Sequence, residues 1–194
     1  MYVFFLVNYI HSINYSKGTL YYNLNNSGEC SLEIDGQINA SLENAFQDIL
    51  KKSEPYDCKS YGVSLNSGGG NVAVAMRLGD IIKTKNMTTT VLDKCKSSCM
   101  YLFISGQTRI ASKHSVLGMH QPVDSDSGAC ITPISIPKNN PHYFKGLQQY
   151  IDARLGSKAG EFYANKDNLA GCNEMLQINN EEFLKEGIIT KLEN

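Results

Sequence analysis

The sequence predicts an α/β fold, with a parallel sheet whose strands are joined by crossover helices. Short β-rich runs alternate with helical patterns along residues 31–120. A connection between parallel strands usually contains a helix, so this alternation favours parallel pairing. The composition is 42% hydrophobic and 19% charged over 194 residues, which is ordinary for a folded domain and supplies enough apolar side chains for a full core.

Each element follows from a local pattern. The expected strands are short and β-rich, and they span residues 31–39, 61–66, 87–92 and 115–120. The expected helices carry apolar residues at helical spacing, and they span residues 40–53, 71–85, 98–105, 143–156 and 179–187. Asn71 stands where it can cap the second helix, and Gly187 ends the last helix before a final strand. Residues 122–141 are rich in Pro, Ser, Asp and Asn, and they read as a long loop.

The charge and the start of the chain limit the class of partner. The net charge is −1, so we expect no nucleic-acid partner. No stretch is long enough to span a bilayer as a helix. The apolar run Tyr2–Val7 fits either the core of a secretory signal or a buried first strand. We therefore separate residues 1–20, as a signal remnant or first strand, from one domain over residues 21–194.

The six cysteines form an even set that favours an oxidising compartment, with the cytoplasm as the alternative. Zinc binding by Cys95 and Cys99 is disfavoured, because no second pair has zinc-like spacing. No metal or cofactor is expected. We expect at least one disulfide bond among Cys58, Cys95, Cys99, Cys130 and Cys172, with Cys130–Cys172 favoured because it would hold the irregular loop.

Three polar turns follow three of the expected strands. Ligands bind at the carboxyl ends of strands in open α/β sheets, so these turns are candidates for one site. The turn Ser67–Gly70 is glycine-rich, which lets backbone amides approach an anion or oxyanion. The turn Lys94–Cys99 would present a serine at a helix start, with Cys99 as an alternative nucleophile. His120 ends the third strand and is the candidate base.

Taken in order, these segments resemble the Clp protease (ClpP) and signal peptide peptidase group within the crotonase-like fold. "DGQINASLENAFQDIL" resembles the family's first strand and helix, and "VSLNSGGGNVAVAMRLGDIIK" resembles its "INSPGG" turn and helix, with Gly68 in place of the proline. "SSCMYLFISGQTRIASKHSVLGMHQP" resembles the stretch from nucleophile to histidine. The resemblance covers residues 32–122 and the tail "EEFLKEGIIT". It implies a fold of repeated β-β-α units.

The resemblance also implies a function and a set of site residues. The function is an ATP-independent serine endopeptidase that acts on peptides or proteins, with a homo-oligomer as one assembly. The "C-x-S-x-C" setting is similar to periplasmic or secreted relatives rather than to the cytoplasmic protease. The family spacing to Gly106 makes Ser97 the nucleophile, and His120 matches the catalytic histidine. The oxyanion-hole residues implied are Gly69, Gly70 and Ser98.

One member of the family's triad is absent from its expected position. Counted back from the tail, the third member is an aspartate, and this chain has Met175 there, which cannot orient an imidazole. The candidates to replace it are Asp167, Asn173 and Glu174. The signal peptide peptidase branch uses a lysine instead, and Lys94 and Lys96 flank the serine turn, although His120 favours the histidine route.

Three functions therefore compete. The leading hypothesis is an active ClpP-like serine peptidase. The missing aspartate motivates an alternative, a catalytically silent ClpP-like protein that binds peptides or scaffolds an assembly. An acyl-CoA enzyme of the crotonase group is disfavoured, because the chain has a serine–histidine pair and lacks a suitably placed carboxylate base.

Overall fold

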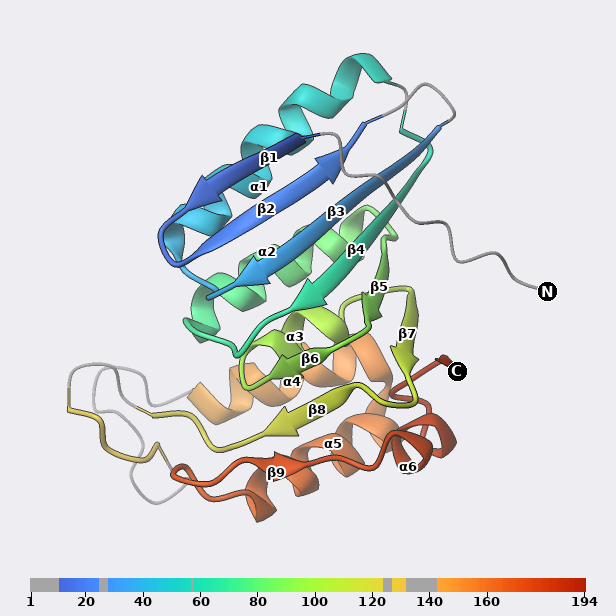
Figure 1. Cartoon of the computed structure of the whole chain (residues 1–194). Coiled ribbons are helices and arrows are strands. Elements are labelled where there is room, and N and C mark those ends of the chain that lie inside the picture. The colour runs from blue at the N-terminus through green and yellow to red at the C-terminus, as the bar shows by residue number, and fades with distance from the viewer. Residues whose placement is uncertain (1–10, 25–27, 57, 124–126, 132–142) are drawn as a thin grey trace.

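The computed structural model describes residues 11–24, 28–56, 58–123, 127–131 and 143–194. These residues form a seven-stranded sheet, a second sheet of three strands and helices packed against them (Figure 1). The predicted α/β class with a mostly parallel central sheet is confirmed. The run Tyr2–Val7, interpreted as a signal or a strand, lies outside the described residues.

The larger sheet has the strand order β1-β2-β3-β4-β5-β7-β10. The first three strands pair antiparallel, and every later neighbour from β3 to β10 pairs in parallel. Asp35 on β3 pairs with Asn66 on β4, so the carboxyl ends of these two strands lie side by side. The strands are β1 His11–Tyr15, β2 Gly18–Asn23, β3 Glu29–Gly36, β4 Ser60–Asn66, β5 Thr88–Val91, β7 Thr108–Ser112 and β10 Lys191–Glu193.

The smaller sheet lies where the central strands end. Its strands are β6 Lys94–Lys96, β8 Val116–Met119 and β9 Leu176–Gln177, in the order β6-β8-β9. The first pair is parallel and the second antiparallel. A single bridge between Ser67 and Cys95 connects the end of β4 to β6. The three polar turns found in the sequence therefore lie close together, near the carboxyl ends of the central strands.

The helices cover the sheets and connect their strands. In Figure 1, α1 and α2 lie on the same face of the large sheet. Asn39 and Asn71 cap these helices, with their side chains accepting from Leu42 N and Val74 N. No helix of the described residues is long and apolar enough to cross a membrane. The helices are α1 Ala40–Ser53, the 3-10 turn η1 Glu54–Tyr56, α2 Val72–Thr84, α3 Cys99–Phe103, α4 Tyr143–Leu155, α5 Ser157–Leu169 and α6 Asn180–Lys185.

The predicted elements agree with the structure where periodicity is strong. Helix α1 has the predicted bounds, because the apolar stripe that predicts it is buried against the sheet: Leu42, Phe46 and Ile49 are all 0% exposed. Helix α5 was not predicted, because only Gly160 and Tyr163 of its residues are buried and no stripe is visible. The strands absent from the prediction are β1, β2, β6, β7 and β9.

Three disulfide bonds use all six cysteines. Cys130 and Cys172 are joined, which confirms the favoured pair. Cys30 was left out of the expected set. It is buried on β3 and pairs with Cys58, because the β3–α1–β4 unit returns the chain beside its own first strand. This many disulfide bonds is typical of proteins in an oxidising compartment.

The C-terminal tail is fastened to the core by one buried arginine. The Arg109 guanidinium donates from Nε to Ile188 O, from Nη1 to Gly106 O and from Nη2 to Gly187 O, at 2.7, 2.9 and 2.9 Å. Burial lowers the pKa of Arg109. These bonds give each guanidinium nitrogen one carbonyl partner and hold the segment before β10 beside β7, so Arg109 has a structural role.

Candidate active site

Ser97 lies in a sharp turn between β6 and α3. Its backbone has φ = 54°, in the left-handed region that a non-glycine residue rarely occupies. The conformation is held from both sides: Ser97 N donates to Gly118 O, and Ser97 O accepts from Met100 N, both at 2.9 Å. Such strained residues persist where the surrounding structure holds them, and they concentrate at active sites. A nucleophile elbow also places its serine in a sharp turn between a strand and a helix.

A disulfide bond closes this turn. Cys95 on β6 and Cys99 at the start of α3 are joined, with their Cα atoms 5.3 Å apart, and both are 0% exposed. The bond therefore braces the two residues between which the chain reverses. It also removes Cys99 as a nucleophile, since a bonded, buried sulfur has no thiolate to offer.

Solvent exposure separates the two serines inside this bracket. Ser97 is partly exposed, whereas Ser98 is 1% exposed. The Ser98 hydroxyl is also buried without a hydrogen-bond partner among the described residues. Of these two serines, Ser97 is therefore the one that solvent reaches.

The glycine turn packs directly against the serine turn. Gly69 has φ = +99° and Gly70 has φ = +150°. A Cβ on Gly69 would lie 2.7 Å from Ser97 Cβ and 3.1 Å from Ser98 N, so no side chain fits there. Glycine at this position permits both the backbone conformation and the close approach of the two turns.

The amides around Ser97 differ in what they bind. Gly69 N donates to Ser67 Oγ at 3.0 Å, so this amide has a structural partner. Within the described part of the chain, the amides of Gly70 and Ser98 have no acceptor. One of these donors is on the residue after Ser97 and the other is on the glycine turn that packs against it, and an oxyanion needs two such donors. This geometry favours Gly70 and Ser98 over Gly69 as donors.

His120 follows β8 and has a defined tautomer. Its Nδ1 lies 2.8 Å from Gln121 O. A carbonyl oxygen can only accept a hydrogen bond, so Nδ1 carries the proton, and in the neutral ring Nε2 is then free to accept one. This is the tautomer that a general base requires.

Ser97 and His120 line the same narrow pocket, with a volume of about 10 Å³, enough for roughly one water molecule. The structure thus brings together two residues that are far apart in the sequence. The remaining walls come from four parts of the chain. They are Val72, Ser98, Tyr101, Met119, Pro122, Tyr163 and Asp167.

Of the three candidates for the third triad position, only Asp167 lines this pocket. Burial raises the pKa of Asp167 to about 7. Asn173 and Glu174 are exposed and lie outside the lining. Met175 is 40% exposed, and its side chain packs beside Gly118. The third triad member remains a prediction.

Sequence reasoning missed Tyr163 as a pocket residue. Tyr163 and Asp167 are four residues apart on α5, so they share one face of that helix. Tyr163 is 1% exposed, and its pKa is raised well above the ordinary value by burial and then by the charge of Asp167. The spacing was visible in the sequence, but α5 itself was not predicted.

Solved structures with this fold include proteases. The ClpP1 of Listeria monocytogenes matches with a TM-score of 0.66 and 18% identity, over 84% of this chain and 91% of that one. A mutant of the same ClpP1 matches at 0.63 and 19%, with the same coverage. A mutant of the 1510-N membrane-bound stomatin-specific protease matches at 0.59 and 18%, over 84% of this chain and 77% of that one. No family model and no curated protein sequence matches the chain.

Proposed function

We propose that the protein is a ClpP-like serine peptidase that cleaves peptides or proteins without ATP. The observation that carries the proposal is the strained turn at Ser97, whose residue lines one pocket with His120. The fold shared with ClpP1 and the stomatin-specific protease supports it. The turn and the pocket are described from this chain's own residues, whereas the likeness to these proteases is one of overall fold.

The geometry suggests a specific mechanism. Ser97 Oγ attacks the substrate carbonyl while His120 Nε2 accepts the hydroxyl proton. The Gly70 and Ser98 amides donate to the oxyanion that forms. His120 returns the proton to the leaving amine as the peptide C–N bond breaks. A water molecule then hydrolyses the acyl-enzyme by the same proton path, and Ser97 is restored.

The third role is assigned to a backbone carbonyl. We propose that Gln121 O, bonded to His120 Nδ1, holds the imidazole in place of the family's carboxylate. A carbonyl fixes the tautomer but supplies no full negative charge to the imidazolium that develops. Turnover is therefore expected to be slower than in a complete triad. Asp167 lines the pocket and stays the alternative for this role.

The compartment and assembly are also proposals. Three disulfide bonds support export to an oxidising compartment, periplasmic or extracellular, because such bonds are rare in the cytoplasm. A homo-oligomer is proposed only from the resemblance to ClpP. Size-exclusion chromatography with light scattering would measure it.

The catalytic proposal is tested with a fluorophosphonate reagent and a mixed peptide library. The reagent should form one covalent bond to Ser97 Oγ with loss of fluoride, seen by intact mass and peptide mapping. Ser97→Ala should abolish labelling and lower peptide hydrolysis roughly ten-thousand-fold, and His120→Ala should match it because the pair acts as a unit. Ser98→Ala is the matched control, since its role is the backbone amide. Labelling that moves to Ser98 would contradict the assignment.

A silent peptide-binding protein is the second candidate. The observation that favours it is Met175, which stands exposed where the family has its aspartate. In that case the wild-type chain would leave both the reagent and the library unchanged, while the library peptides would still bind. Binding without labelling would decide for this alternative.

A further inference from the structure

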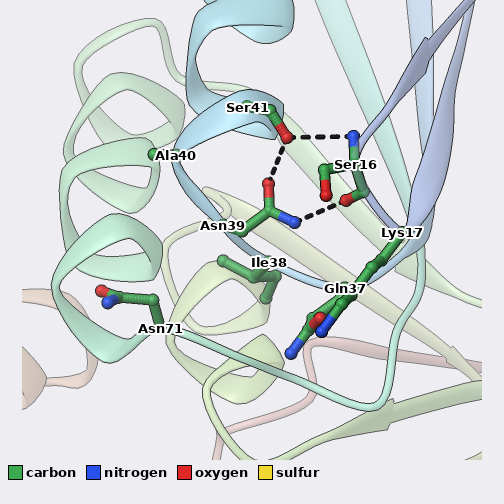
Figure 2. A pocket seen from close by; sticks show the side chains of 8 residues that line it. All are labelled: Ser16, Lys17, Gln37, Ile38, Asn39, Ala40, Ser41 and Asn71. Carbon is green, nitrogen blue, oxygen red and sulfur yellow. Dashed lines mark hydrogen bonds between the residues drawn. The ribbon is translucent and has the colours of Figure 1, made fainter. Parts of the chain in front are cut away.

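A shallow, solvent-open pocket of about 420 Å³ lies beside the glycine turn (Figure 2). We call it the Lys17 pocket. It is formed by the β1–β2 turn, the segment that leads from β3 into α1, and the residue that caps α2. Its lining residues are Ser16, Lys17, Gln37, Ile38, Asn39, Ala40, Ser41 and Asn71.

Hydrogen bonds hold together the side of the Lys17 pocket that is formed by the β1–β2 turn and the start of α1. Asn39 Nδ2 donates to Ser16 O at 2.6 Å, and Asn39 Oδ1 accepts from Ser41 Oγ at 2.7 Å. Ser16 N donates to Ser41 Oγ at 3.1 Å, and Gln37 N donates to Lys17 O at 3.0 Å. The hairpin turn is thus tied to the start of α1, so the cavity has a defined shape.

The remaining polar side chains of the pocket have spare donors. Among the described residues, Lys17 makes no ion pair, and the side-chain nitrogens of Lys17, Gln37 and Asn71 donate to no protein acceptor. Asn71 uses only its Oδ1, which accepts from Val74 N. Figure 2 shows the Lys17 and Gln37 side chains extending in the same direction, with Asn71 on another wall.

Lys17 is the charged residue of the pocket lining. No Asp or Glu is among its lining residues, so Lys17 gives it a net positive charge. Among the described residues, neither of the two nearby carboxylates forms an ion pair with Lys17. Asp35 accepts from Asn66 Nδ2 at 3.0 Å, and Glu43 forms an ion pair with Arg77 at 2.6 Å. A pocket with spare donors, one cation and no carboxylate in its lining suits a carboxylate ligand.

The pocket is directly connected to the proposed oxyanion turn. Ile38 N donates to Gly69 O at 3.0 Å, and Asn71 N donates to Ile38 O at 2.9 Å. Neighbouring strands lie about 4.8 Å apart, and an extended peptide advances about 3.3 Å per residue. A peptide whose scissile carbonyl faces the Gly70 amide would therefore reach the Lys17 pocket within roughly two or three residues.

We propose that the Lys17 pocket binds a carboxylate of the peptide substrate, close to the cleaved bond. The carboxylate is either an Asp or Glu side chain or the C-terminus of a short peptide, and both present the same two oxygens. The inference rests on the proposed peptidase function for the nature of the ligand. Lys17 would then be a specificity residue that makes no contact with the reacting atoms.

The test pairs Glu with Gln in internally quenched peptides. One position at a time, within three residues on either side of the mapped cleavage site, carries either residue, and a second series ends in a free carboxylate or an amide. At one position or terminus, kcat/KM should favour the carboxylate by about fivefold at low salt, the size of an exposed charge pair. This preference should weaken as added salt screens the charges.

Substitutions assign the preference to the pocket. Lys17→Gln should reduce the ratio to about one and Lys17→Glu should reverse it, while fluorophosphonate labelling of Ser97 stays at the wild-type rate. Lys17 has φ = 65°, and glutamine bears the same backbone strain, so Lys17→Gln should fold normally. Lys52→Gln, an exposed lysine at the far end of α1, is the matched control and should keep the wild-type ratio.

The failure of this inference differs from the failure of the proposed function. If Ser97 is labelled and peptides are hydrolysed, but every Glu and Gln pair has the same kcat/KM, the proposed role of the Lys17 pocket is wrong and the proposed peptidase function is still supported. The full chain carrying Ser97→Ala supplies a second readout, namely the affinity of dye-labelled Glu and Gln peptides by fluorescence anisotropy. A Lys17-dependent Glu preference there would support the pocket even if the wild type proved inactive.

Discussion

Replacing Asp167 with asparagine is expected to stabilise the protein, and more strongly at alkaline than at acidic pH. Burial raises the pKa of Asp167 to about 7 from the ordinary 3.8. Each pKa unit is worth about 1.36 kcal/mol, so the full difference corresponds to roughly 4 kcal/mol. Because the side chain is partly exposed, solvent screening reduces this, and we expect about 2 kcal/mol.

The direction of the pH dependence follows from proton binding. Between about pH 4 and pH 7 the folded protein keeps a proton on Asp167 that the unfolded chain has released, so stability falls as pH rises. Below about pH 4 both states are protonated, and above about pH 7 both are ionised, so the difference is constant there. Asparagine does not titrate, so the gain of the variant should grow across this window and level off above it.

Urea denaturation of both proteins at about pH 5 and pH 8 measures this gain. Asp93→Asn is the control, because Asp93 is exposed and its substitution should leave the pH dependence unchanged. If Asp167→Asn were less stable than the wild type at pH 8, an ionised carboxylate held by a donor would be indicated, and the reasoning would be refuted. Loss of peptidase activity by powers of ten in the same variant would make Asp167 the group that orients His120.

Three further predictions concern the glycine turn next to Ser97 and two of the disulfide bonds. Gly69→Ala should lower stability by about 2 kcal/mol and abolish fluorophosphonate labelling, since its Cβ would meet Ser97 at φ = +99°. Gly68→Ala, with no atom within 4 Å of the added Cβ, should be neutral in the same two assays. Removing the Cys130–Cys172 bond by double serine substitution should cost about 4 kcal/mol of unfolding free energy, because it closes 42 residues. Removing the Cys95–Cys99 bond, four residues apart, should cost only about 2 kcal/mol yet slow labelling sharply, and equal labelling rates would show that it does not position Ser97.

Local patterns were enough to predict the class of the fold. Helices α1 and α2 each carry a continuous apolar stripe behind an asparagine cap, and both signals lie within one short segment. Strands β3, β4, β5 and β8 were predicted because each lies in a short β-rich run. Helix α5 and the β1–β2 hairpin lack such a pattern, since their packing is decided by contacts with distant parts of the chain.

In the candidate site, too, some features follow from the sequence and others depend on the tertiary structure. The sequence by itself determined which residue types are present: a serine turn between two cysteines, a glycine turn, and a histidine after a strand. Only the tertiary structure decided that Ser97 is more exposed than Ser98 and that Gln121 O fixes the His120 tautomer. It also decided that the Gly69 amide has an acceptor while the Gly70 amide has none among the described residues. Exposure, hydrogen-bond pairing and tautomer depend on atoms brought together by the pairing of β4, β6 and β8, and no local pattern in the chain encodes those distances.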